Sequence, residues 1–217
     1  MRGARTFKPR RRGLGSARQR TFDALKPVWS FDEEGDLLEP LVYFEECNRV
    51  CVEIGSGNGS LASSFARSHR TTGLISVDVH RPGIARLLDD IGEFELGNLR
   101  VVEGDALVFL ERLPTASIDE LWVFFPDPWP KNSQAHRRLI SADRLPALAR
   151  PIRLGGYLRM ATDVDSYAEQ MRRLVEGSDL FDEVVAERPE WRIETAFEAR
   201  GRMAGRSATD LRCRRRH

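Results

Sequence analysis

A short apolar strand that runs directly into a glycine-rich turn constrains the fold of this chain more than any other feature. Residues 49–54 read Arg-Val-Cys-Val-Glu-Ile, and residues 55–59 read Gly-Ser-Gly-Asn-Gly. Apolar residues at Leu61, Phe65 and Ala66 then follow a helical pattern. A strand, a glycine turn and a helix in this order occur where a doubly wound sheet binds a nucleotide-like ligand. The sequence therefore predicts an α/β fold with a ligand site at this turn.

The rest of the chain alternates between strand and helix patterns. Further strands are expected at residues 73–78, 99–103, 118–125, 157–162, 183–187 and 209–214. Helices are expected over residues 82–91, in a short stretch ending at Leu113, and after Asp163 as far as Leu174. A longer helical region is expected over roughly residues 137–153, with interruptions at Pro146 and Pro151. Helices between successive strands imply right-handed crossovers and a mainly parallel sheet. We expect a mostly parallel seven-stranded sheet flanked by helices.

The spacing of the glycines indicates the class of cofactor. Gly55, Gly57 and Gly59 are spaced G-x-G-x-G, whereas a dinucleotide turn is spaced G-x-G-x-x-G, and no P-loop Lys follows. Acids follow the next two strands: Asp78, placed to bind both ribose hydroxyls, and Asp105, placed to meet an adenine amino group. Together these features favour S-adenosylmethionine over NAD or no ligand. The glycine turn alone would equally suit a tight strand-to-helix connection.

A proline-framed carboxylate follows the strand at residues 118–125. Residues 124–131 read Phe-Phe-Pro-Asp-Pro-Trp-Pro-Lys, and the prolines stop the strand because they have no N–H to donate. Asp127 is thereby held beside an indole and an ammonium, which suits a planar, hydrogen-bonding substrate such as a purine. Trp129 is expected either to stack on that base or to lie in the core.

Basic residues gather at the two ends of a chain whose net charge is +1. Residues 1–20 hold eight basic residues and no acid, and residues 200–217 hold seven against Asp210, so the body between them is acidic. Arginine matches phosphate geometry and its binding releases counterions, so the N-terminal cluster favours a nucleic-acid partner over an inert tail. For the C-terminal cluster a phosphate-binding surface and a solvated tail stay equally open.

Composition argues against several other classes of protein. No apolar stretch approaches the roughly 20 residues of a membrane span, and we expect no secretory signal. Cys47, Cys51 and Cys213 form no paired framework, and the histidines show no metal spacing. We expect a cytoplasmic protein with no disulfide framework and no metal site. Monomer and homodimer both stay open.

The motifs taken together resemble those of the bacterial tRNA (guanine-N7-)-methyltransferases. The resemblance covers nearly the whole chain and is carried by residues 5–7, 12–13, 19–20, 53–59, 79–83, 124–129, 160–163, 195–198 and 200–201. The glycine turn is shared with many methyltransferases, whereas Phe-Phe-Pro-Asp-Pro-Trp and the late Thr-x-Phe-Glu are specific to this family. The resemblance implies a Rossmann-like class I methyltransferase fold. It also implies transfer of a methyl group from S-adenosylmethionine to N7 of guanine 46 in the tRNA variable loop.

The resemblance further implies roles for single residues and segments. The expected cofactor-binding set is Glu53, Gly55, Gly57, Asp78, Asp105 and Asp127. Asp127 also matches the family's proposed active-site residue, and the expected tRNA-guanine contacts are Lys131, Asp163, Thr195, Phe197 and Glu198. Residues 1–30 are expected to form a basic RNA-binding extension, and residues 31–217 one methyltransferase domain.

Two positions depart from the family pattern. Asp78 stands where glutamate is usual, and its side chain is one methylene shorter. Ala196 stands where a basic residue is usual, so a phosphate or base interaction is either missing or supplied by Arg192 or Arg200.

Transfer to guanine N7 requires no general base, because that nitrogen carries a lone pair and no proton. In-line positioning and stabilisation of the charge gained by the purine then supply the catalysis. A carboxylate that accepts from guanine N1–H and the N2 amine does both, and Asp127, Asp163 and Glu198 are the candidates. Plainer roles stand beside these: Asp163 as a helix cap, Lys131 as a surface ammonium, and His80 as a structural hydrogen-bonding residue.

Two other classes of function share part of this pattern. A small-molecule methyltransferase would have the glycine turn and the acids but would not need basic ends. A non-catalytic RNA-binding protein would use the basic ends and would not bind S-adenosylmethionine.

Overall fold

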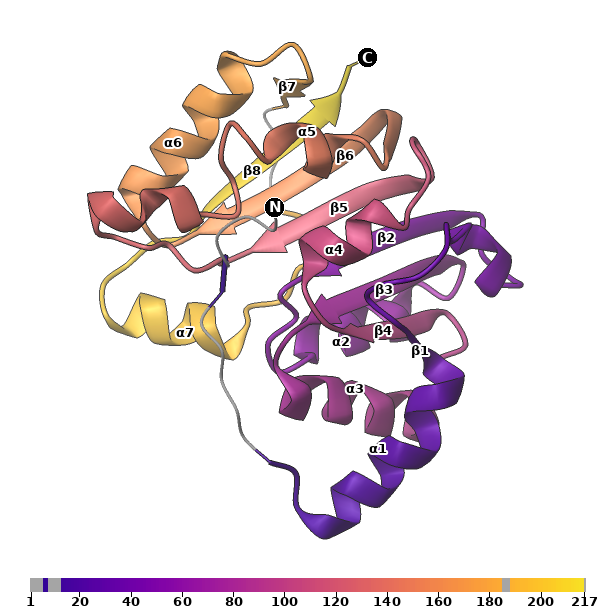
Figure 1. Ribbon diagram of the computed structural model, residues 1–217. Coiled ribbons are helices and arrows are strands. Elements are labelled where there is room, and N and C mark those ends of the chain that lie inside the picture. Colours follow the sequence, from indigo (N-terminus) through magenta and orange to yellow (C-terminus); the bar gives the residue numbers. More distant parts are fainter. Residues whose placement is uncertain (1–5, 8–12, 185–187, 217) are drawn as a thin grey trace.

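A single mixed sheet organises the chain in the computed structural model, which describes residues 6–7, 13–184 and 188–216 (Figure 1). Within the described residues the sheet has eight strands in the order β1-β4-β3-β2-β5-β6-β8-β7. Their bounds are β1 Ser30–Phe31, β2 Arg49–Ile54, β3 Thr72–Asp78, β4 Leu99–Glu103, β5 Ile118–Phe124, β6 Ile152–Thr162, β7 Phe181–Glu183 and β8 Thr209–Arg215. Strands β1 to β6 pair in parallel, and β8 pairs antiparallel with both β6 and β7.

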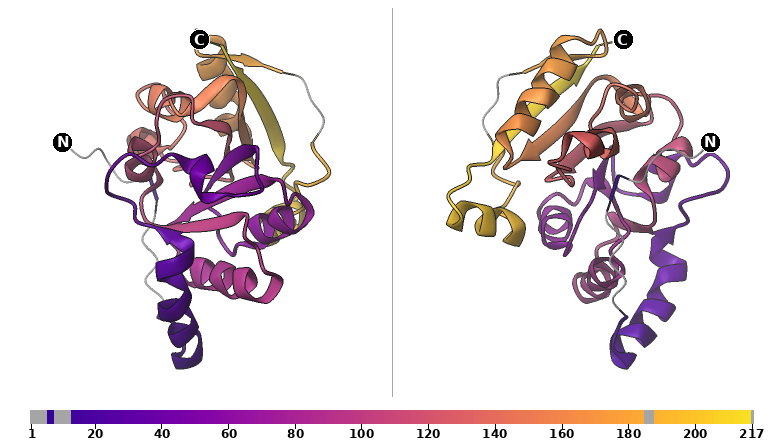
Figure 2. Two further views of the ribbon diagram at one scale, coloured as in Figure 1. Left: turned by 90° about the vertical axis from the view of Figure 1, so that its right-hand side faces the viewer. Right: turned by 60° about the vertical axis from the view of Figure 1, so that its left-hand side comes forward.

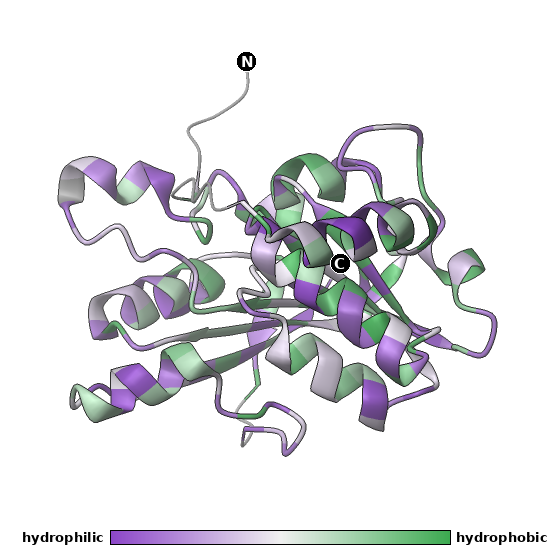
Figure 3. Ribbon diagram, turned by 90° about the horizontal axis from the view of Figure 1, so that it is seen from below, coloured by the Kyte–Doolittle hydropathy of each residue, from purple (hydrophilic) through white to green (hydrophobic). Residues whose placement is uncertain are grey.

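Helices cover both faces of the sheet, as the two side views show (Figure 2). The α-helices are α1 Ser16–Trp29, α2 Ser60–Ser68, α3 Arg81–Phe94, α4 Ala106–Glu111, α5 Leu145–Ala149, α6 Asp165–Glu176 and α7 Ala196–Met203. Two short 3-10 helices are η1 Pro40–Tyr43 and η2 Asn132–Arg137. Hydrophobic and hydrophilic residues lie on different sides of the longer helices (Figure 3), which is the pattern of helices that bury one side.

The two faces of the sheet carry separate apolar cores. Along β2, Val50 and Val52 belong to the core under α4, α5 and α6, whereas Cys51 between them belongs to the core under α1, α2 and α3. Successive strand residues point to opposite faces, so an unbroken apolar strand is buried on both. Helix α7 differs from the others, because its buried residues are Glu198 and Gly201.

The order of the strands places two chain segments at one edge. Strand β2 lies between β3 and β5, so the crossovers run in opposite directions on its two sides. Ile54 at the end of β2 is level with Val123 in β5. Ligands bind parallel sheets at such a switch point, beyond the carboxyl ends of the strands. The glycine turn after β2 and the proline segment after β5 therefore face each other.

The mostly parallel sheet flanked by helices is confirmed, with one strand more than expected. The extra strand, β1, spans two residues, which is too short for an alternating pattern, and it adds Ser30 and Phe31 beside β4. It follows α1, which was not among the expected helices. Strand β7 lies at Phe181–Glu183, slightly before the expected position, and residues 185–187 of that expectation lie outside the described residues.

The helical region expected over roughly residues 137–153, with interruptions at Pro146 and Pro151, is confirmed only in part. Only Leu145–Ala149 is α-helical, and β6 already begins at Ile152. Pro151 cannot continue a helix because it lacks an N–H and crowds the preceding turn. Upstream, the Arg144 guanidinium donates to the backbone carbonyls of His136 and Arg138 and so supports a loop.

Candidate functional site

The glycine turn after β2 is shaped for the close approach of a ligand. Gly55 and Gly57 have φ values of +82° and +60°, and a Cβ added at either would meet no atom within 4 Å. Positive φ favours glycine, and the missing side chains leave open space. The turn is fixed from below by α3, where a Cβ at Gly83 would lie 1.8 Å from the carbonyl oxygen of Gly57.

Two acids lie beneath this turn. Glu53 is 3% exposed, and its carboxyl accepts one long hydrogen bond, 3.4 Å, from the Ser76 hydroxyl. Burial, and next the charge of Asp78, raise the pKa of Glu53 to about 8. The Asp78 carboxylate accepts from the backbone N–H groups of Gly57, at 2.6 Å, and His80, at 2.7 Å. Burial raises the pKa of Asp78 and these two bonds oppose the rise.

His80 connects the turn to the start of α3. Its Nδ1 lies 3.1 Å from the carbonyl oxygen of Gly57, a hydrogen bond that requires the proton on Nδ1. His80 also precedes the first residue of α3 as its N-cap. The structure thus gives His80 the hydrogen-bonding position in the turn that its sequence context suggested.

Asp105 stands at the end of β4 and begins α4. Its Oδ1 accepts from the backbone N–H of Leu107 at 3.0 Å and so caps the helix. The Glu33 carboxylate accepts from the backbone N–H of Asp105. Asp105 therefore holds the start of α4 at the wall of the pocket, which it also lines.

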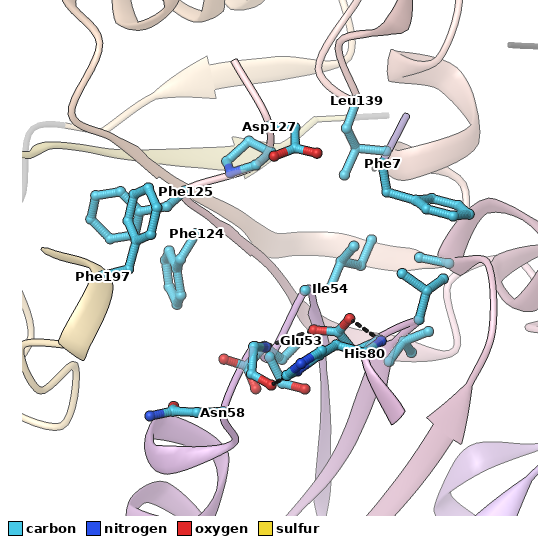
Figure 4. A pocket seen from close by; sticks show the side chains of 18 of the residues that line it. Phe7, Glu53, Ile54, Asn58, His80, Phe124, Phe125, Asp127, Leu139 and Phe197 are labelled. Atoms are coloured by element: carbon cyan, nitrogen blue, oxygen red, sulfur yellow. Dashed lines mark hydrogen bonds between the residues drawn. The ribbon is translucent and has the colours of Figure 1, made fainter. Parts of the chain in front are cut away.

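These groups surround one cavity of about 380 Å³ (Figure 4). Of the expected cofactor set, all six residues line it: Glu53, Gly55, Gly57, Asp78, Asp105 and Asp127. The buried hydroxyl of Ser56, on the same wall, has no hydrogen-bond partner among the residues that the structure describes. Such an orphaned group needs a partner from a ligand or a water. The carboxylates of this set fit S-adenosylmethionine, because the cofactor offers two positive groups, two ribose hydroxyls and an amino group to such acceptors.

The opposite wall is the segment after β5. Phe125 adopts φ +52°, a left-handed conformation that is strained for a bulky residue, and its N–H donates to the carbonyl of Ala161 at 2.8 Å. Its ring lies 5.7 Å from the ring of Phe197. Figure 4 shows these two rings side by side, with Asp127 nearby on the same wall. An aromatic pair next to a carboxylate presents both a stacking surface and an acceptor.

Trp129 lies in the core and not on the pocket surface. It is 4% exposed, and its indole N–H donates to the carbonyl of Thr6 at 2.9 Å. The guanidinium of Arg137 lies 3.6 Å from its ring centre. Of its two predicted roles, the core one is therefore confirmed. Thr6 and Phe7 in turn line the cavity, which places part of the N-terminal segment against the ligand site.

The described residues show neither a metal-binding cluster nor a membrane-spanning helix. They hold no group of three or more His, Cys, Asp or Glu side chains placed to bind one metal ion. Their helices are each too short or too polar to cross a bilayer.

Known proteins are similar in sequence to most of this chain. A family model described as a putative methyltransferase matches residues 47–211. The tRNA (guanine-N(7)-)-methyltransferase of Nitrosospira multiformis is 36% identical, over 95% of this chain and 92% of its own length. Those of Streptomyces avermitilis and Neisseria meningitidis are 37% and 35% identical, each over 97% of this chain and over 75% and 90% of their own lengths. The chain belongs to the tRNA (guanine-N7-)-methyltransferase family.

Solved structures support the fold of this family member. An antibiotic-related methyltransferase is 17% identical with a TM-score of 0.59, over 84% of this chain and 96% of its own. The aminoglycoside resistance methyltransferase NpmB1 is 16% identical with a TM-score of 0.55, over 83% and 95%. At this level of identity the likeness confirms the expected class I methyltransferase fold.

The expected guanine contacts of the family divide into two groups. Thr195 and Phe197 line the cavity, and the Thr195 hydroxyl also accepts from the N–H of Glu198 as the N-cap of α7. Lys131, Asp163 and Glu198 are not among the residues that line it. Lys131 is exposed and precedes η2.

Two of these carboxylates are held by arginines. Asp163 accepts from Nε of Arg206 at 2.8 Å, and the N-cap of α6 is Val164, so Asp163 does not cap that helix. Glu198, 6% exposed, accepts from the guanidinium groups of Arg188 and Arg192. In this structure both carboxylates therefore pair with the protein's own cations.

Several residues of the family member's site were not predicted from the sequence. Ser56, Phe125, Thr6 and Phe7 line the cavity; each belongs to a motif that carries the resemblance, but none was assigned a role. Positive φ at a non-glycine residue such as Phe125 leaves no trace in the sequence. Arg192 and Arg200 were the two candidates to supply the interaction of the basic residue that is usual at position 196. Arg200 lines the cavity, whereas Arg192 is 3% exposed and so is closed to a phosphate.

Proposed function

We propose that this protein is an S-adenosylmethionine-dependent tRNA (guanine-N7-)-methyltransferase that acts on guanine 46 of the variable loop. The observation that carries the proposal is the single cavity that joins the glycine turn and its acids to Phe125, Asp127 and Phe197. One end suits the cofactor and the other suits a flat base. Family membership supports the same reaction, because the relatives are tRNA (guanine-N(7)-)-methyltransferases. A tRNA substrate also favours the cytoplasm as its location.

The cofactor end would hold S-adenosylmethionine through the groups already described. Gly55 and Gly57 give its amino-acid part access to the backbone, and Glu53 and Asp78 accept from its positive group and its ribose. Asp105 accepts from the adenine amino group. Bound in this way, S-adenosylmethionine supplies an electrophilic methyl group on a sulfonium sulfur.

The substrate end would orient guanine without removing a proton from N7. Asp127 accepts hydrogen bonds from the Watson–Crick edge of the base, and its charge stabilises the positive purine that forms. Thr195 and Phe197 lie across the cavity from Asp127. The adjacent rings of Phe125 and Phe197 would offer the base one stacking surface. Asp163 would join these contacts once RNA competes for Arg206, and Glu198 would join them while it keeps its pair with Arg192. The exposed Lys131 would reach the RNA directly.

Reaching a base inside folded tRNA requires that the base leave its stack, which costs a few kcal/mol unless the RNA is open there. We propose that residues 1–30 form an RNA-binding extension on the domain of residues 31–217 and offset this cost with phosphate contacts. Within it, Arg18 in α1 pairs with Asp89 at 3.0 Å and is half exposed. Arg2, Arg5, Lys8 and residues 10–12 lie outside the described residues.

The test is methylation of unmodified tRNA with labelled S-adenosylmethionine, followed by N7-methylguanosine-specific reduction and strand scission. Cleavage at guanine 46, and none in a tRNA with adenine at that position, is the expected result. Label at another guanine would overturn the position and keep the reaction. Label in a metabolite but not in tRNA would favour a small-molecule methyltransferase, and tRNA binding without cofactor binding would favour a non-catalytic RNA-binding protein.

A further inference from the structure

A buried arginine connects the two walls of the substrate end. Arg192 lies in the segment between β7 and α7, and its side chain is 2% exposed. One guanidinium nitrogen, Nη1, lies 3.2 Å from Oε2 of Glu198 in α7. Nε lies 2.8 Å from Oδ1 of Asp210 in β8. The same group therefore ties α7 to an antiparallel strand of the sheet.

The same guanidinium also lies over aromatic rings of the other wall. Its central carbon lies 4.9 Å from the ring centre of Phe124 and 5.5 Å from that of Phe125. These two residues lead directly into Asp127. A guanidinium stacks on aromatic rings and forms directed bonds in its plane at the same time, which a lysine ammonium cannot do. Arg192 thus contacts both chain segments that would hold the base.

Stability alone is a poor explanation for this arrangement. Burial lowers the pKa of Arg192, and Asp210 and Glu198 oppose that effect by charge. Its Nε and Nη2 are both buried without a hydrogen-bond partner among the described residues, so the contact of Nε with Asp210 is an ion pair and not a directed hydrogen bond. A buried ion pair of this kind often contributes less to stability than apolar side chains of the same volume. A role in geometry accounts better for its presence.

We propose that Arg192 is a positioning residue for methyl transfer, which holds α7 and the segment of residues 124–127 at a fixed separation across the cavity. The inference rests on the proposed function, since the object held between these walls is the guanine base. Arg192 touches neither cofactor nor substrate. It acts through Glu198 and through the ring of Phe125.

The first test replaces Arg192 by Met, which keeps volume and removes the charge. A displacement of about 1 Å at the reacting atoms is enough for a hundredfold loss. We therefore expect Arg192→Met to lose about a hundredfold in kcat with tRNA, while its Kd for S-adenosylmethionine stays within about threefold. The control is Arg202→Gln on the same helix as Glu198, which breaks an exposed pair with Glu194 and should keep normal turnover.

A double-variant cycle asks whether Arg192 acts through Glu198. If it does, Arg192→Met combined with Glu198→Gln loses little more than the worse single variant. Losses that multiply would overturn the inference, as would a folded Arg192→Met protein with wild-type kcat. A parallel loss of cofactor affinity would overturn it as well. If Arg192→Met does not fold, Arg192→Lys is the variant, and a loss of about tenfold in kcat is expected because lysine cannot contact both carboxylates.

A second readout needs no activity. Hydrogen exchange should quicken in α7 and at the Phe125 amide in the Arg192 variant, and stay unchanged in Arg202→Gln. Unchanged exchange in both segments would overturn the inference. If the wild-type protein methylates no tRNA, the proposed function fails, whereas the exchange comparison still decides whether Arg192 holds the two walls.

Discussion

At the scale of single residues, the ligand site combines groups that the protein leaves partly unsatisfied. Glu53 is buried with one long hydrogen bond, and the Ser56 hydroxyl has none. Burying such groups costs free energy unless a ligand completes their contacts. The substrate end has the opposite character, since Asp163 and Glu198 are already paired with arginines. The cofactor end is therefore prepared for its ligand, whereas at the substrate end Asp163 must exchange Arg206 for the RNA.

Replacing Asp127 by Asn tests its role as an acceptor. The amide keeps the shape of the side chain and removes the charge that would stabilise a positive purine. We expect Asp127→Asn to lower kcat by about a hundredfold or more. The Kd for S-adenosylmethionine, measured by calorimetry, should change far less. Asp143→Asn, which alters an exposed carboxylate away from the cavity, is the control. Equal losses in kcat and in cofactor affinity would contradict a role in positioning the base.

Glu53 should make stability depend on pH. Its pKa in the folded protein is about 8, against an ordinary value of 4.5, so the folded state binds more protons than the unfolded state between these values. The free energy of unfolding should therefore fall as pH rises from about 4.5 to 8. Thermal unfolding without ligand should show a Tm that decreases across this window, and Glu53→Gln should flatten the decrease. The same slope in the Gln variant would contradict the assignment.

At the scale of elements, the apolar pattern and the topology explain what the sequence could predict. The strands that are buried on both faces lie where their apolar runs place them, and the cofactor residues follow those strands. The pairs around α7 were not predictable, because Arg206 and Asp163 are 43 residues apart and meet only in the fold. Residues 137–153 are helical only at Leu145–Ala149 for another reason: apolar spacing there resembles a helix, and side-chain bonds from Arg144 support a loop before it.

Helix α3 offers a matched pair of glycines. A Cβ at Gly83 would lie 1.8 Å from the Gly57 carbonyl oxygen, whereas one at Gly92 would make an ordinary 3.5 Å approach to Leu25. Gly83→Ala should displace the glycine turn and lower the affinity for S-adenosylmethionine by about tenfold or more, roughly 1.4 kcal/mol. Gly92→Ala should leave the affinity unchanged and stabilise the helix by up to about 1 kcal/mol. Calorimetry measures the affinity and thermal unfolding measures the stability. Equal affinities in the two variants would refute the role of Gly83 in fixing the glycine turn.

At the scale of the whole molecule, the two basic ends have different surroundings. The C-terminal arginines are not a loose tail, because residues 209–215 form β8 within the sheet. Arg212 lies 4.0 Å from the ring centre of Tyr157, and Arg216 pairs with Asp182. In the sequence, the N-terminal arginines lie on both sides of Thr6 and Phe7, and these two residues line the cavity. A polyanion bound by the N-terminal segment would therefore lie close to the ligand site.

Arg10, Arg11 and Arg12 should contribute to tRNA binding through charge. Replacing these three arginines together by Gln keeps Thr6 and Phe7 in the chain, whereas deleting the N-terminal segment would remove them. We expect tRNA binding to weaken, and the slope of log K against log salt to fall by about 0.7 to 0.9 for each phosphate that the variant no longer neutralises. Filter binding at several salt concentrations measures the slope, with cofactor affinity as the control. A weaker complex with an unchanged slope would argue against phosphate binding by these arginines.

The aromatic cluster beside Arg192 gives the protein an optical signal of its own. The indole of Trp191 stacks on that of Trp122, with ring centres 4.4 Å apart and an interplanar angle of 25°. Two indoles this close couple their electronic transitions, and near-ultraviolet circular dichroism reports fixed tertiary packing of aromatic rings. Because Trp191 is the neighbour of Arg192 in the chain, any movement of the segment before α7 separates the chromophores. Replacement of Arg192 should thus be visible in the spectrum of the unlabelled protein.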